Sequence, residues 1–246
     1  FIPYLFLAEK KLSLDVIFFG FLLGILFFLS QMFCFLSLRR GDASLMTPIM
    51  GTKPVFVAFF VVLFNLVPNE IPISTWVAVG LSALSIGLIG WPSKGSVFSI
   101  QGLLLAVAGA AGFGLLDSLV PYFTRNSDPF FLLFIVFGSV GLISITIIPW
   151  TEGSFLPYRK GTDIWMWLSA LPMGGQAICM SMAIGLYQVP TEVNIFYAGR
   201  GFWSVILVVI FGGWLGLKEG HSSASLIFRR MIGALLLLIG VWLTSF

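Results

Sequence analysis

Residues 16–38, VIFFGFLLGILFFLSQMFCFLSL, form an apolar run of twenty-three residues without a charged side chain. About 20 apolar residues in a helix cross the roughly 30 Å hydrocarbon core of a bilayer. Because a spanning segment must satisfy its backbone polar groups internally, this run predicts a transmembrane helix. Within it, Gly20 and Gly24 lie four residues apart, a spacing that predicts close packing against a neighbouring helix. The run ends at the charged segment Arg39-Arg40-Gly41-Asp42.

Seven further apolar runs of similar character follow along the chain. We expect helices over residues 44–66, 74–91, 100–123, 130–150, 164–187, 192–217 and 226–244. Strands of a transmembrane barrel alternate apolar and polar residues, whereas Val55–Phe64 and Leu235–Val241 are apolar on every face. The sequence therefore predicts an all-α, polytopic membrane helical bundle with about eight full helices.

The composition excludes several classes of protein. Hydrophobic residues make up 59% of the 246 residues, charged residues make up 9%, and the mean hydropathy is +1.05. Soluble domains carry about 25% charged residues, so a soluble globular core is excluded. The net charge of +3 forms no basic stripe with interleaved aromatics, and we expect no nucleic-acid partner. No set of His, Cys, Asp and Glu has metal-ligand spacing, so we expect neither a metal nor another cofactor.

Two parts of the chain resemble each other at a nearly constant offset. Residues 80–87, GLSALSIG, share Gly, Leu, Ile and Gly at the same spacing with residues 233–240, GALLLLIG, about 153 positions later. Upstream, residues 51–53 correspond to residues 199–201 at an offset of about 148. This order indicates an internal repeat with a period of about 150 residues.

The repeat divides the chain into two units. Residues 96–246 are expected to hold a complete five-helix repeat. Residues 1–95 are expected to hold helices three to five of the other copy and the end of its second helix, with the copy's start preceding the chain. An odd number of helices per copy places the copies in opposite orientations in the membrane. Inverted repeats are a transporter architecture, with the substrate site at the repeat interface.

Residues 38–50, LRRGDASLMTPIM, are similar to the helix–turn–helix signature of EamA-type members of the drug/metabolite transporter superfamily. An acidic residue and a turn before each Gly-x6-Gly helix, with Glu70 in one half and Glu219 in the other, also resemble this family. The resemblance covers essentially the whole chain. It implies ten helices in two inverted five-helix repeats, movement of small metabolites, often outward, and cytoplasmic termini. The basic residues of the visible loops favour the opposite orientation under the positive-inside rule.

Three ionisable side chains lie deep inside expected helices: Lys53, Asp117 and Arg200. A charged group at this depth in a membrane costs free energy, so such residues are candidates for a functional site. Lys53 and Arg200 occupy corresponding positions of the two copies and can together hold a carboxylate or phosphate. Asp117 can act as a counter-ion in the empty site or as a proton carrier for coupling. The alternative is an internal salt bridge of Asp117 with either cation that only holds helices together.

Four polar side chains complete the candidate substrate site. Gln31 and Gln176 lie in helices that the repeat makes equivalent, and Asn194 and Tyr197 lie one or two turns from Arg200. Residues at this spacing share part of a helix face. The alternative role for all four is hydrogen bonding between helices, which polar residues provide in membranes.

The leading hypothesis is a secondary transporter, not an enzyme, that exports a small anionic metabolite by alternating access. An organic acid, an amino acid and a phosphorylated compound all fit as cargo. We expect a multi-pass protein of the plasma or inner membrane whose partners are the bilayer and the small molecule, as a monomer or a homodimer. The alternative is a membrane-embedded enzyme acting on a lipid or prenyl group, although the loops 151–163 and 218–225 contain no recognisable acid–base motif. A non-transporting sensor or assembly subunit is a third possibility.

Overall fold

The computed structural model describes residues 13–41, 46, 49–66, 71–89, 99–125, 127–150, 163–199, 210 and 224–244. Its elements, in chain order, are α2 (Leu14–Arg40), α4 (Lys53–Leu63), α5 (Ile73–Ile89), α6 (Ile100–Thr124), α7 (Pro129–Ile147), the 3-10 turn η1 (Ile148–Trp150), α8 (Asp163–Tyr187), α9 (Pro190–Ala198) and α11 (Ala224–Thr244). Every element in this described part of the chain is helical, which confirms the all-α prediction.

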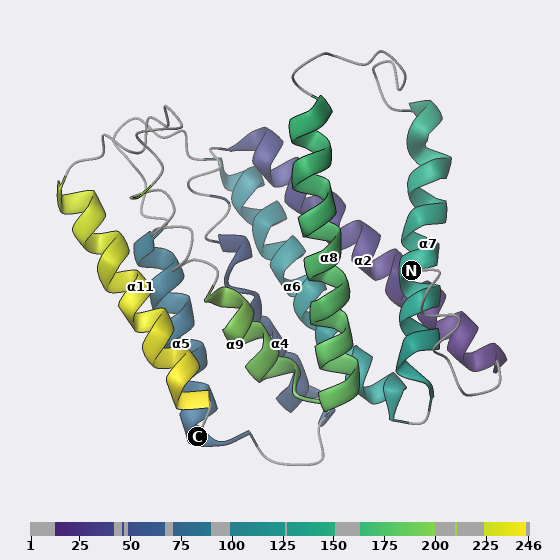
Figure 1. Cartoon of the computed structure of the whole chain (residues 1–246), viewed down its shortest axis with the longest axis horizontal. Coiled ribbons are helices and arrows are strands. Elements are labelled where there is room, and N and C mark those ends of the chain that lie inside the picture. The colour runs from purple at the N-terminus through teal and green to yellow at the C-terminus, as the bar shows by residue number, and fades with distance from the viewer. Residues whose placement is uncertain are drawn as a thin grey trace.

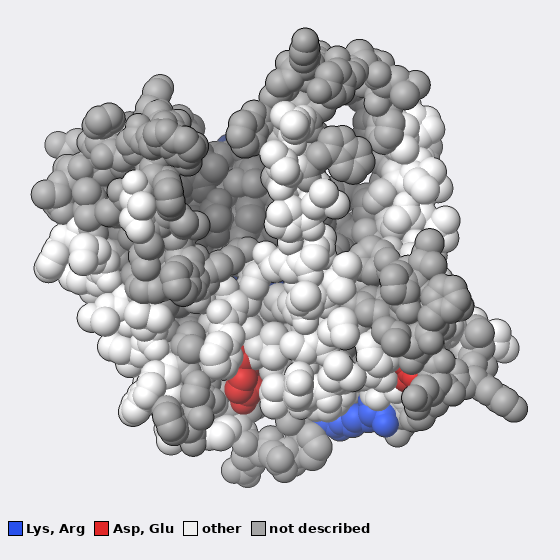
Figure 2. Space-filling view, in the orientation of Figure 1, with Lys and Arg blue, Asp and Glu red and all other residues white. Residues whose placement is uncertain are grey.

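Four helical segments are long and apolar enough to cross a membrane: Leu14–Arg40, Ile100–Thr124, Pro129–Ile147 and Ala170–Tyr187. Large apolar side chains such as Phe18 and Leu142 are exposed on the flanks. On the face in Figure 2 most of the described charged side chains lie in the lower part of the view, below described residues that are uncharged. These features indicate a membrane protein. In the described residues α4 and α5 are shorter, at 11 and 17 residues, so only part of the expected set of eight full spans is reproduced.

Capping side chains explain where three of the helices begin. Ser13, Ser99 and Asp128 each accept hydrogen bonds from backbone N–H groups two or three residues further along, at the starts of α2, α6 and α7. The first N–H groups of a helix have no partner within the helix, so these caps stabilise the observed starts. Four helices, α5 to α8, begin within one residue of the predicted positions.

The prediction of one continuous helix over residues 44–66 is wrong. Residues 49–50 are helical, Gly51 and Thr52 form a turn, and α4 begins only at Lys53. Pro54, near the start of α4, has no N–H to continue a preceding helix. Hydropathy is insensitive to such a break because the residues on both sides are apolar.

The expected helix over residues 192–217 also differs from the structure. The corresponding element, α9, begins at Pro190 and ends at Ala198, where the N–H of Gly199 bonds back to the carbonyl of Ile195. Of the remaining positions, the structure describes only Ile210, which is helical. The described part of this helix is therefore about two turns long, with its end next to the predicted site.

The helices form two groups joined by a central pair (Figure 1). α5 packs along α11 at one side, and α2 packs across α6 and α7 at the other, with α8 against α6. Between the two groups lie α4 and α9, which contact each other and members of both groups. Side chains at the centre of the bundle therefore come from α4, α6, α8 and α9.

Glycines allow two of these helix pairs to approach closely. A Cβ on Gly24 would lie 2.8 Å from the carbonyl oxygen of Val136 in α7, and a Cβ on Gly114 would lie 3.2 Å from the backbone nitrogen of Val57 in α4. A Cβ on Gly20 would clash with Ile135 in the same way. The predicted seam at Gly20 and Gly24 is confirmed.

The two similar glycine segments do not occupy equivalent places. Gly233 and Gly240 in α11 are buried against α5. Gly80 and Gly87 in α5 are exposed, and no described residue from another part of the chain lies within 4 Å of an added Cβ. Instead, the residues of α5 that face α11 include Ser85, whose hydroxyl donates to the carbonyl of Gly233. The glycines that match in sequence therefore lie in different surroundings, and the repeat stays a prediction.

Candidate functional site

A buried ion pair lies where α4 and α6 meet. Lys53 is the first residue of α4, directly after the Gly51–Thr52 turn. Its Nζ lies 2.5 Å from Oδ2 of Asp117, and the two side chains are only 13% and 7% exposed. Long cationic side chains in membrane proteins often extend to the surface, but this one points inward to a carboxylate. The interrupted helix therefore delivers a cation to the interior of the bundle.

The position of Asp117 depends on the close contact of α6 with α4. Gly114, one turn earlier, leaves room for the α4 backbone. Ser118 strengthens this contact, because its hydroxyl donates to the carbonyl of Val57 at 3.2 Å and to that of Gly114 at 2.7 Å. The Asp117 side chain is thus fixed beside the first turn of α4, where a helix carries a positive partial charge.

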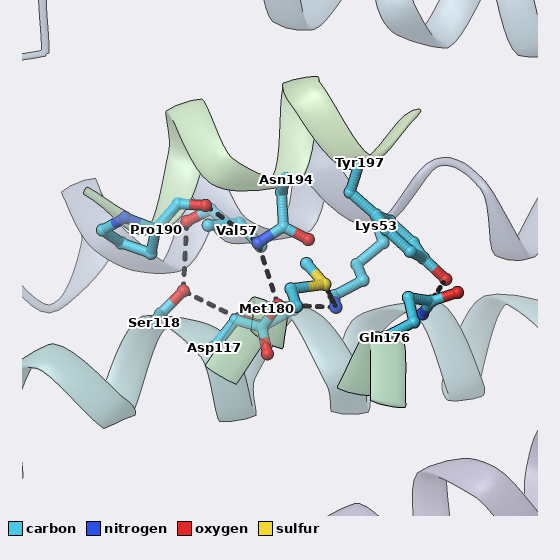
Figure 3. Close-up of polar contacts among 10 residues, drawn as sticks. Lys53, Val57, Asp117, Ser118, Gln176, Met180, Pro190, Asn194 and Tyr197 are labelled. Atoms are coloured by element: carbon cyan, nitrogen blue, oxygen red, sulfur yellow. Dashed lines mark hydrogen bonds and ion pairs between the residues drawn. The ribbon is translucent and has the colours of Figure 1, made fainter. Parts of the chain in front are cut away.

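Asn194 of α9 is the third member of the site and is fully buried, at 0% exposure. Its Nδ2 donates to Oδ2 of Asp117 and to the carbonyl of Pro190, both at 2.8 Å. Its Oδ1 has no hydrogen-bond partner among the described residues. In Figure 3 this oxygen points away from Asp117, toward the side on which Lys53 and Tyr197 lie. A buried acceptor without a partner costs about 1–3 kcal/mol, so this oxygen can accept a donor from a bound molecule.

Aromatic and sulfur groups surround the ammonium of Lys53. Its Nζ lies 5.5 Å from the ring centre of Phe113, 5.6 Å from that of Tyr197 and 4.0 Å from the sulfur of Met180. Rings at this distance attract a cation through their π faces. The hydroxyl of Tyr197 accepts a hydrogen bond from Nε2 of Gln176 at 3.0 Å (Figure 3). These contacts hold the cation without neutralising it, which only Asp117 does among the described residues.

Most of the predicted site residues come together here. Lys53, Asp117, Asn194, Tyr197 and Gln176 form one connected set of contacts, which we call the central cluster. The salt bridge weighed in the sequence analysis is thus present between Asp117 and Lys53. The predicted role of Arg200 as a second cation lies outside the described residues.

Gln31 does not belong to the central cluster. It lines a separate cavity of about 380 Å³ between α2 and α7, together with Phe28, Met32, Phe35, Leu36, Arg39, Val140 and Ser144. The predicted equivalence of Gln31 with Gln176 therefore does not place the two amides at one site. Both helices contact α6 and α7, but Gln176 donates to Tyr197 of α9, whereas Gln31 faces the space between α2 and α7.

Sequence reasoning missed three residues of the site. Phe113, Ser118 and Met180 contact the central cluster but resemble ordinary residues of apolar helices. The available signals were indirect: Phe113 and Ser118 lie within one turn of Asp117, and Met180 lies one turn after Gln176. Among the described residues, no group of three or more His, Cys, Asp or Glu is placed to hold a metal ion.

Comparison with known proteins gives information on the fold alone. No protein-family model matches the sequence, and no curated protein matches it. One solved structure, described only as a crystal structure of a protein, is similar over 95% of this chain and 79% of that chain. The TM-score is 0.65 and the sequence identity is 15%. The arrangement of helices is therefore one that a known protein also adopts.

Proposed function

We propose that this chain is a secondary transporter that moves a small anionic metabolite across the membrane by alternating access. The observation that carries the proposal is the buried pair of Lys53 and Asp117, linked to Asn194. Ionisable groups buried in a membrane bundle are expensive, and they mark substrate and ion pathways. The pair lies at the start of an interrupted helix, a typical feature of transporter binding sites.

The chemistry of the cluster suggests how it works. A carboxylate or phosphate on the cargo can replace Asp117 as the partner of Lys53, since both are oxyanions. Asp117 then needs a proton or another partner, because an unpaired buried charge is strongly unfavourable. Proton uptake by Asp117 therefore supplies the coupling in this proposal, and the free Oδ1 of Asn194 supplies an acceptor for a donor group on the cargo. Arg200, at the predicted corresponding position, would be the second cation.

The directions of α5 and α11 agree with the inverted repeat in this proposal, although their contacts do not follow the register of the sequence match. Ser85 donates to the carbonyl of Gly233, and a Cβ added to Gly240 would lie 3.4 Å from the carbonyl oxygen of Ala78. Residue numbers thus rise along one helix as they fall along the other, so the helices are antiparallel. Opposite directions are what an inverted repeat requires of the last helix of each copy.

The remaining parts of the proposal follow from this organisation. Residues 1–95 and 96–246 are the two copies, and the cluster lies between them because Lys53 belongs to the first and Asp117 and Asn194 to the second. Relative movement of the copies would open the cluster to either side of the membrane. We assign the chain to the EamA-type transporters on the sequence resemblance, and its location to the plasma or inner membrane.

Flux measurements in proteoliposomes test the proposal. The probes are a labelled dicarboxylate, an acidic amino acid and a sugar phosphate, each with and without a proton gradient. We expect Lys53→Gln to lower flux of the transported anion at least tenfold, and Asp117→Asn to make the remaining flux independent of the gradient. Asp15→Asn is the control, because Asp15 is an exposed charge in the first turn of α2, away from the central cluster. Unchanged anion flux in Lys53→Gln would reject the role of this site.

A further inference from the structure

The cavity between α2 and α7 is separate from the central cluster and arises from the way these helices diverge. At Gly20 and Gly24 the two helices are in close contact. Further along α2 the same side of the helix carries Gln31 and Phe35, and here the partner residues Val140 and Ser144 line an open space instead. The volume of about 380 Å³ lies in the range of small-molecule sites, about 300–1,000 Å³.

The lining of this cavity is apolar along most of its length and cationic at one end. Phe28, Met32, Phe35 and Leu36 form the wall contributed by α2, and Arg39 lies in the last turn of that helix. Phe28 and Arg39 are eleven residues apart, so the wall extends about 16 Å along the helix axis. Phe35 is 60% exposed, so the cavity is open to the flank of the bundle.

The charge at this end is available for a ligand. Arg39 is exposed, and it forms no ion pair with the described residues. Its neighbour Arg40 differs, because its guanidinium donates to Oε1 of Gln101 and it does not line the cavity. Both arginines end a transmembrane helix, at the level where lipid headgroups lie. The two adjacent cations thus have equal charge and similar depth but different access to the cavity.

We propose that this cavity is a binding site for an anionic membrane lipid. The acidic headgroup would bind Arg39, and one acyl chain would lie along Phe28, Met32, Phe35 and Leu36. Basic residues next to a membrane attract anionic headgroups by about 1 kcal/mol each. An acyl chain, which already lies in hydrocarbon, would bind the apolar wall through van der Waals packing. The occupant therefore needs both an acid group and a hydrocarbon chain, which distinguishes it from the small polar cargo of the central cluster.

Native mass spectrometry of the purified chain in detergent tests this site, with phosphatidylglycerol and phosphatidylcholine of equal chain length as probes. We expect retention of phosphatidylglycerol to exceed that of phosphatidylcholine. Arg39→Gln should weaken phosphatidylglycerol binding about fivefold, the factor for loss of one cation–headgroup contact. Arg40→Gln is the matched control and should leave the binding unchanged. Val140→Phe, which fills the cavity without changing charge, should also lower retention.

Each of the other outcomes counts against the site. Equal losses in Arg39→Gln and Arg40→Gln would show attraction to a charged surface rather than binding in the cavity. Unchanged retention of phosphatidylglycerol in either Arg39→Gln or Val140→Phe would also overturn the proposal. So would equal competition by glycerol 3-phosphate, which has the headgroup charge but no acyl chain. Monodisperse gel filtration of every variant shows that each is folded, so that lost retention reports the site.

Discussion

Removing one member of the buried ion pair should destabilise the protein strongly, whereas removing both should not. At 2.5 Å the attraction between Lys53 and Asp117 is about 7 kcal/mol for an effective dielectric constant of about 20. Desolvation of the two ions cancels much of this gain. Loss of one partner is nevertheless expected to cost about 3–5 kcal/mol, because it leaves the other charge buried and unpaired.

The substitutions Lys53→Met, Asp117→Leu and the double variant form the appropriate cycle. Reversible unfolding in mixed detergent micelles, followed by circular dichroism, gives the free energy of unfolding of each variant. We expect each single variant to lose about 3 kcal/mol and the double variant to lose clearly less than either single variant, since an apolar pair of similar volume replaces an ion pair at little cost. Asp15→Asn controls for loss of an exposed charge.

Additive effects would refute this reasoning. If the double variant loses the sum of the single losses, the two side chains do not interact in the folded protein. Single losses below about 0.5 kcal/mol would place both charges in contact with water, because exposed ion pairs contribute about that amount. Either result would remove the basis for a buried binding site.

Three further predictions concern packing and the surroundings of the cluster. Gly24→Ala should lower the free energy of unfolding by about 1–3 kcal/mol through overpacking against the carbonyl of Val136. Gly80→Ala, whose Cβ has open space around it, should be neutral or stabilising by up to about 1 kcal/mol. Equal changes in the free energy of unfolding of the two variants would contradict the helix contacts. Asn194→Leu should lower the free energy of unfolding by about 0.6–2 kcal/mol, because the hydrogen bond to Asp117 is lost. The matched control Val189→Leu, at an exposed position just before α9, should leave the free energy of unfolding unchanged. Tyr197→Phe should retain anion flux because the ring that faces Lys53 remains, while Tyr197→Leu should reduce it; equal flux in both variants would separate Tyr197 from the transport site.

Much of the fold could be predicted from the sequence because long apolar runs have few alternatives in a membrane. The starts of α5 to α8 lie within one residue of prediction, since each follows a polar or charged segment. The break before Lys53 was missed, although Pro48, Gly51 and Pro54 are all residues that interrupt helices. Hydropathy favoured one continuous helix over residues 44–66 because most residues before and after the break are apolar.

The candidate site was predictable in its charges but not in its geometry. Lys53, Asp117 and Asn194 stand out as polar residues in apolar helices, and all three meet. Which cation pairs with Asp117 depends on the approach of α4 to α6 at Gly114, a contact between residues about 60 positions apart in sequence. That Gln31 lies outside the central cluster could not be predicted for the same reason, because helix periodicity gives the side of a helix but not the neighbour that it faces.

The contact of α5 with α11 has a consequence for how the molecule moves. The closest part of its interface includes the short side chains of Ala78, Ser82 and Ser85 and the glycines Gly233 and Gly240. Such short groups have few rotamers to exchange, so the two backbones have little freedom to slide or rotate against each other. The two helices would therefore move as one rigid unit, and a rearrangement that exposes the interior would move the other helices relative to this unit.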